Sequence, residues 1–72
     1  MRYPELAAER VVRALEKAGF YVRRQTGSHV VMRRDEPFAQ TIVPRHASVK
    51  PVILHEILKQ AGLELDDFLK LV

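Results

Sequence analysis

The chain has 72 residues, of which 47% are hydrophobic, and a formal net charge of +3 at neutral pH. This length allows one small domain, and the apolar share excludes disorder as its main state. Because cysteine is absent, the chain can form neither a disulfide framework nor a thiolate zinc site. Its apolar runs are far shorter than the roughly 20 residues of a membrane span, and no secretory signal is evident. We therefore expect a cytoplasmic protein with no membrane segment.

The positive charge is concentrated in the first half of the chain. Residues 1–34 contain eight Lys and Arg against three Glu, whereas residues 35–72 contain four basic and six acidic side chains. A basic segment of this kind favours a polyanion as one partner. On charge alone, a soluble protein with a modestly basic surface explains the pattern equally well.

A helix is predicted over residues 4–18. Pro4 suits the first helical position, where a missing N–H costs nothing. Apolar residues follow the spacing of a core-facing stripe, which consists of Ala8, Val11, Val12, Leu15 and Ala18. Gly19 then stands where a left-handed C-cap is expected.

Three strands are predicted next, because the pattern changes to a period of two from Phe20 onward. They cover residues 20–25, 28–34 and 38–43. Gly27 lies in the turn between the first two, since glycine readily takes the positive φ that a tight hairpin requires. The short connections favour an antiparallel meander.

A second helix is predicted to begin at Pro51 and to end at Gly62, followed by a short helix within residues 66–71. The chain is thus expected to be a single α+β domain over residues 1–72, in the order α-β-β-β-α with a short C-terminal α. Each long helix has one apolar stripe. Both helices should therefore pack on the same face of a three-stranded antiparallel sheet and leave the other face open.

Strand alternation predicts which side chains reach this open face. Those expected to point outward from the first two strands are Tyr21, Arg23, Gln25, His29, Val31 and Arg33. Those expected to face the helices are Phe20, Val22, Val30 and Met32. Guanidinium and imidazole groups together suit the binding and cleavage of a phosphodiester backbone. An ordinary solvated sheet face would carry similar residues, so both interpretations stay open.

Five sequence blocks occur in a specific order between about Leu15 and Phe68. They are residues 15–20, residues 24–29 with Gly27-Ser28-His29, residues 43–46, residues 57–63, and Asp67-Phe68. Together they resemble the HicA-type mRNA interferase toxins, also called YcfA-like proteins. This resemblance covers almost the whole chain.

The resemblance implies a fold similar to a double-stranded-RNA-binding domain, and metal-independent cleavage of mRNA without a cofactor. It also implies that His29 is the catalytic residue and that a HicB-type antitoxin is the protein partner. The family often has Gly-Thr at the start of the second helix, where this chain has Val52-Ile53. A contact made there by a hydroxyl group or a closely approaching backbone is therefore in question.

A ribonuclease needs no metal if it manages protons and charge, because RNA carries its own nucleophile in the 2′-OH. We expect His29 to act as general base or general acid, since an imidazole titrates near neutral pH. Arg23 and Arg33 would neutralise the charge that develops on the phosphorus centre. Only one acid–base group is evident, which predicts a slow nuclease or one that takes a second group from substrate or water.

The other two histidines have less specific interpretations. His46 is either a solvated loop residue or a second catalytic group, and His55 is expected at the surface or boundary of the second helix. A zinc site of the three histidines is not expected, because the sequence contains no short ligand pair.

Additional RNA contacts are predicted at Ser28, Tyr21 and Lys50, each with a structural alternative. The Ser28 hydroxyl binds a phosphate or, as is more common in a hairpin turn, bonds its own backbone; Gly27 is structural. Tyr21 stacks on an unpaired base or fills the sheet edge. Lys50 flanks a phosphate track or only solvates its helix.

Two other classes of function remain open from the sequence. One is a non-catalytic RNA-binding module on the same scaffold, which would tolerate Gln or Asn in place of His29. The other is a regulatory partner whose open face binds only a protein, and whose binding would show little salt dependence.

Overall fold

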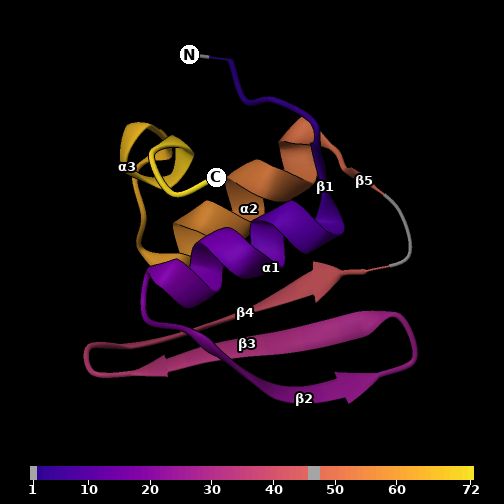
Figure 1. Ribbon diagram of the computed structural model, residues 1–72, viewed down its shortest axis with the longest axis vertical. Coiled ribbons are helices and arrows are strands. Elements are labelled where there is room, and N and C mark those ends of the chain that lie inside the picture. The colour runs from indigo at the N-terminus through magenta and orange to yellow at the C-terminus, as the bar shows by residue number, and fades with distance from the viewer. Residues whose placement is uncertain (1, 46–47) are drawn as a thin grey trace.

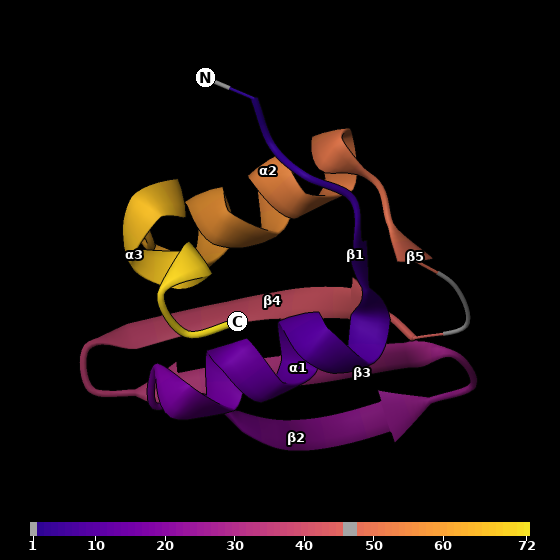
Figure 2. The ribbon, with the colours of Figure 1, turned by 45° about the horizontal axis from the view of Figure 1, so that its top comes forward.

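The main sheet has three antiparallel strands in the order β2-β3-β4. The computed structural model describes residues 2–45 and 48–72. β2 covers Tyr21–Thr26, β3 covers His29–Asp35 and β4 covers Phe38–Pro44. Figures 1 and 2 show the helices on one side of this sheet; they are α1 (Ala8–Lys17), α2 (Pro51–Ala61) and the short α3 (Leu65–Leu69). The predicted fold class, the order of the helices and of the three main strands, and the one-sided packing are confirmed.

The first helix begins later than predicted. Leu6–Ala7 form a two-residue strand, β1, which pairs antiparallel with β5 (Ser48–Val49) in a second small sheet. This pairing holds the backbone of Leu6 and Ala7 extended, so these residues cannot join the helix. The prediction of a helix from Pro4 is therefore wrong, and neither short strand was expected.

Both long helices end at the predicted glycines. After α1, Gly19 has a φ of 99°, and the N–H of Phe20 donates to the carbonyl of Leu15 at 3.0 Å. After α2, Gly62 has a φ of 72°, and the N–H of Leu63 donates to the carbonyl of Leu58 at 3.0 Å. These bonds form the Schellman motif, which satisfies carbonyls left unpaired at a helix end.

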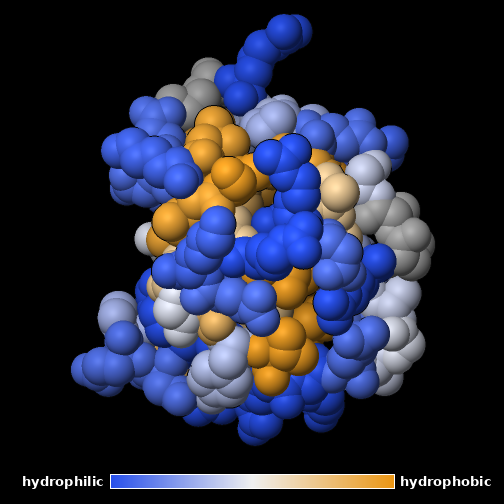
Figure 3. All heavy atoms as spheres, viewed as in Figure 1, coloured by the Kyte–Doolittle hydropathy of each residue, from blue (hydrophilic) through white to orange (hydrophobic). Residues whose placement is uncertain are grey.

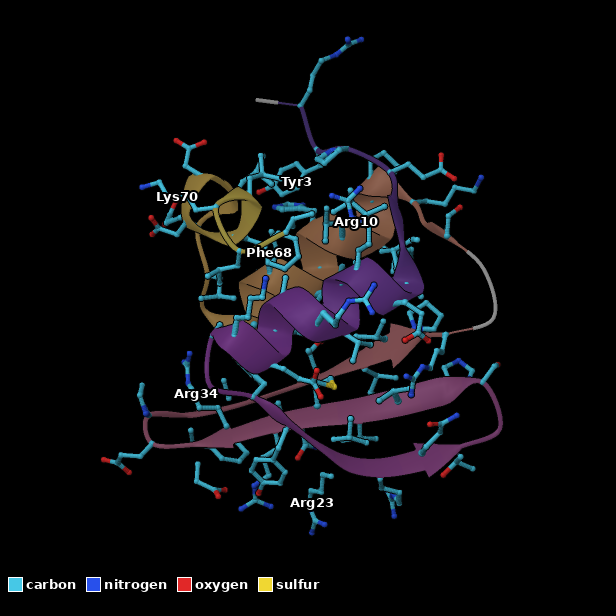
Figure 4. All side chains as sticks on the ribbon, in the orientation of Figure 1. Tyr3, Arg10, Arg23, Arg34, Phe68 and Lys70 are labelled. Atoms are coloured by element: carbon cyan, nitrogen blue, oxygen red, sulfur yellow. The ribbon has the colours of Figure 1, made fainter. Side chains whose placement is uncertain are left out.

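The core lies between the helix layer and the inner face of the sheet. Its largest fully buried apolar side chains are Phe68, Leu15, Met32, Leu54, Ile57, Leu58, Val11, Val30, Val43 and Val49. Figure 4 shows Phe68 directed from α3 into the helix layer, where it belongs to the same cluster as both long helices. On the face seen in Figure 3, charged side chains cover α1, while hydrophobic atoms remain visible around α3. A five-residue helix therefore contributes one of the core's largest side chains.

Replacement of Phe68 should strongly destabilise the fold. Its side chain is fully buried, whereas the adjacent Leu69 is 41% exposed. We expect Phe68→Ala to lower the free energy of unfolding by about 3–5 kcal/mol. Leu69→Ala, the matched control, should lower it by less than about 1 kcal/mol. Chemical denaturation followed by circular dichroism measures both; similar losses would contradict the assigned packing of α3.

Candidate functional site

A two-residue turn joins β2 to β3 and places His29 at the first position of β3. The central residues are Gly27 and Ser28, and the flanking Thr26 and His29 are paired across the hairpin. Gly27 has a φ of 57°, while no described non-glycine residue has a positive φ. This is the pattern of a type II′ turn. A Cβ at Gly27 would meet nothing within 4 Å, so the need for glycine comes from backbone conformation and not from crowding.

His29 lies on the open face of the sheet, as predicted. The register puts it opposite Thr26 on β2 and Pro44 on β4, and residues directly opposite one another share a face. The next residue, Val30, is fully buried on the helix side. The His29 side chain is exposed, and no hydrogen bond or ion pair joins its imidazole to another described residue. The ring is therefore accessible to a substrate at the sheet surface.

A β-bulge in β2 changes which of its side chains share this face. The register shifts between Val22 and Arg24, so that β2 has one extra residue there. Gln25 is opposite the buried Val30 and so lies on the helix side, whereas Arg24 lies on the open face. The predicted outward position of Gln25 is wrong, because simple alternation assumes no extra residue. Figure 4 shows Arg23, at the bulge, pointing away from the helices.

Arg24 is a diagonal neighbour of His29 on the open face. It is directly opposite Val31, two residues beyond His29 on β3. Diagonal neighbours have Cα atoms about 7–8 Å apart, which is within the reach of long side chains. Arg24 is exposed, and no hydrogen bond or ion pair joins its guanidinium to another described residue. Val31, expected to point outward, does lie on this face but is only 9% exposed.

Arg33 and Tyr21 form a separate cluster at the other end of the open face. Arg33 is four residues beyond His29, or about 13 Å along the strand. Its Nε donates to Asp35 Oδ1 at 2.8 Å, and its guanidinium lies 5.2 Å from the centre of the Phe38 ring. The Tyr21 hydroxyl donates to the same carboxylate, at 3.1 Å from Oδ2. The structure thus does not bring Arg33 or Tyr21 beside His29.

Arg45, directly after β4, links the hairpin turn to α1. Its backbone N–H donates to the carbonyl of Ser28 at 2.6 Å. Its guanidinium donates to both carboxylate oxygens of Glu9, at 2.5 and 2.9 Å, and to Oε1 of Gln25 at 3.0 Å. Three segments distant in the sequence therefore meet at one side chain.

This ion pair shifts the pKa of both partners. The hydrogen bond from Arg45 lowers the pKa of Glu9, against a smaller opposing effect of desolvation. The same hydrogen bond raises the pKa of Arg45. A carboxyl group with a lowered pKa in the folded state contributes stability above its ordinary pKa of about 4.3. That contribution is lost as the pH falls through the folded-state pKa.

Residues 8–63 match the family model described as the HicA toxin of bacterial toxin–antitoxin systems. The chain belongs to the HicA toxin family. The match begins at the first residue of α1, includes the whole three-stranded sheet and ends just beyond α2. The resemblance inferred from the sequence blocks is therefore confirmed. A search of curated proteins found no match.

Other residues singled out in this HicA-family chain lie away from the open face or outside the described residues. Lys50 precedes α2 in the helix layer, and its Nζ lies 3.6 Å from a Glu5 carboxylate oxygen. Val52 is the second residue of the same helix and is 74% exposed. His55 is exposed, as predicted, with its ring centre 4.8 Å from that of Tyr3. His46 falls outside the described residues.

Sequence reasoning missed Arg24 and Arg45 as parts of this site. The run Arg23-Arg24-Gln25 contains no apolar residue that would mark the inner face, so nothing in it signals a bulge. The carboxylate that binds Arg45 is 36 positions away in the chain. The only signal that includes either arginine is the set of family blocks.

Within residues 2–45 and 48–72, no three His, Asp or Glu side chains are grouped so that they could hold a metal ion. None of the helices described there is long and apolar enough to span a bilayer.

The Glu9 titration provides a direct test of the Arg45 contact. We expect the pKa of Glu9 in the folded protein to lie below the ordinary Glu value and to rise in Arg45→Gln, because the hydrogen-bond donor is lost. Arg13→Gln is the control, since Arg13 acts on Glu9 only through a smaller Coulomb attraction. NMR detection of the Glu9 side-chain carboxyl carbon against pH measures this pKa in the wild type and in both variants. Equal shifts in the two variants would contradict the hydrogen bond.

Proposed function

We propose that this toxin is a metal-independent endoribonuclease that cleaves mRNA with His29 as its general acid or base. The observation that carries the proposal is the exposed imidazole of His29 on the open face, with the guanidinium of Arg24 diagonal to it. Membership of a toxin family supports an activity that harms the cell. Cleavage of the RNA backbone can proceed without a metal, because the 2′-OH of RNA is an internal nucleophile.

In this mechanism the 2′-oxygen attacks the adjacent phosphorus while His29 accepts its proton as general base. The bond from phosphorus to the 5′-oxygen breaks, leaving a 2′,3′-cyclic phosphate and a 5′-hydroxyl that takes its proton from water. His29 can instead donate the proton to the leaving oxygen, with water acting as the base. One such group typically contributes about 10²–10⁴ in rate. A single histidine is therefore consistent with a slow nuclease.

The positive charge that the reaction requires comes best from Arg24. Its guanidinium shares the open face with His29, whereas that of Arg33 is hydrogen-bonded to Asp35. A guanidinium presents two parallel donors to phosphate oxygens. Arg23 points away from the helices at the bulge (Figure 4), which suits contact with a neighbouring phosphate. We assign charge stabilisation to Arg24, with Arg23 and Arg33 as outlying contacts to the RNA backbone.

The protein partner in this proposal is a HicB-type antitoxin that covers the open face. The face combines basic side chains with exposed apolar ones, since Phe38 is 64% and Ile42 50% exposed. A partner that buries these apolar groups and brings acidic groups toward Arg24 would block RNA from His29. The same surface would then serve substrate and antitoxin in turn.

His29→Ala should abolish most of the cleavage. We expect the rate on a defined mRNA fragment to fall by about 10²–10⁴-fold, and growth arrest on expression to disappear. His55→Ala is the matched control, because His55 is exposed on α2 in the helix layer. Gel analysis of purified, folded variants measures the rates.

Cleavage by His29→Ala at the wild-type rate would refute the catalytic assignment. Wild-type protein that binds this RNA tightly without cutting it would favour the non-catalytic RNA-binding module instead.

Arg24 should contribute one phosphate contact to RNA binding. With His29→Ala as the parent, so that the RNA stays intact, Arg24→Gln should reduce the slope of log affinity against log salt by about 0.7. Arg33→Gln should reduce it less, because Asp35 already compensates that charge. Titration of a fluorescent single-stranded RNA at several salt concentrations gives the slopes. An unchanged slope in Arg24→Gln would exclude the contact.

A further inference from the structure

The β2 side of the hairpin that carries His29 has little apolar packing to hold it, because the fully buried residues near the turn, Val30 and Val43, lie on β3 and β4. All six residues of β2 are exposed, and Gly27 has open space around its Cα. Polar contacts near the turn therefore have to hold this side of the hairpin.

Arg45, at the point where the chain leaves the sheet, supplies such contacts through both its backbone and its side chain. Its backbone N–H donates to the carbonyl oxygen of Ser28, the residue directly before His29, at 2.6 Å. Its side chain crosses to the helix side and bonds Gln25 and Glu9. The amide nitrogen of Gln25 in turn donates to the carbonyl of Gly27 at 3.4 Å. The turn is thus connected to α1 through one guanidinium.

We infer that Arg45 is a positioning residue that fixes the His29 end of the hairpin to Glu9 of α1. This inference rests on the proposed ribonuclease function of His29. Glu9 belongs to a regular helix of ten residues, so it gives the turn a rigid reference point. Loss of the link would let the hairpin end move relative to the rest of the sheet. Displacements of about 1 Å can lower a catalytic rate by about 10²-fold.

The competing role for Arg45 is direct contact with the RNA phosphate. The guanidinium already directs its Nε, Nη1 and Nη2 groups to Glu9 and Gln25, which favours the positioning role. The two roles predict opposite effects of removing the Glu9 charge. If Arg45 positions the turn, Glu9→Gln weakens catalysis. If Arg45 binds RNA, Glu9→Gln releases it and strengthens binding.

The experiment compares single-turnover cleavage by Glu9→Gln, Arg45→Gln and a charge-swapped double variant, Glu9→Arg with Arg45→Glu. We expect both single variants to lower the rate at saturating RNA by about 10-fold or more, with less than about a twofold change in half-saturating RNA concentration. The double variant restores an ion pair between the same positions and should recover part of the rate. Glu16→Gln is the control, because it removes a nearby acidic charge on α1 that does not bond Arg45.

Amide hydrogen exchange, measured by NMR without RNA, gives a readout that is independent of cleavage. Both single variants should exchange faster at residues 26–29 than the wild type, and Glu16→Gln should not. Tighter RNA binding with an undiminished rate in Glu9→Gln would overturn the inference, as would unchanged exchange and rate in Arg45→Gln. If His29→Ala cleaves normally while exchange still responds to Arg45→Gln, the proposed function fails and the structural link stands.

Discussion

The arrangement of the open face depends on one extra residue in β2. The inner face of the sheet is fixed by Val30 and Met32, which are fully buried. Opposite them, Val22 and Gln25 both have to face inward, although three positions separate them in the chain. A regular strand cannot meet that condition, because side chains three residues apart point to opposite faces. The bulge resolves the conflict, and as a result it moves Arg24 to the outside and Gln25 to the inside.

Both consequences of the bulge meet at the turn that carries His29. On the outer face, Arg24 becomes a diagonal neighbour of the imidazole. On the inner face, Gln25 comes within 3.0 Å of Arg45 Nη1. An unbulged β2 would exchange these two side chains, which would leave the outer face with an amide and Arg45 facing another cation. The bulge therefore sets both the charge beside His29 and the contacts behind it.

An element could be predicted from the sequence when the residues that determine it are close together in the chain. In β3, Val30 and Met32 stand two residues apart and mark the inner face, so the outward position of His29 follows from strand alternation. Helix ends at Gly19 and Gly62 were predictable because local backbone conformation decides them. The arginine-rich stretch of β2 has no such marker. The start of α1 depends on the pairing of β1 with β5, which lies some forty residues later in the chain. No local sequence pattern indicates this pairing.

The distribution of apolar residues explains why the candidate site is a surface and not a cleft. A chain of 72 residues has enough apolar side chains for one layer between helices and sheet, but not for a second layer on the outer face. In the proposed function, RNA would be held on this face mainly by its charge. All the described helices pack on the other side of the sheet, so none of them covers this face (Figure 2). In the proposed function, an antitoxin that covers the sheet would control the toxin, and the exposed Phe38 and Ile42 beside the basic groups would provide the apolar area for it.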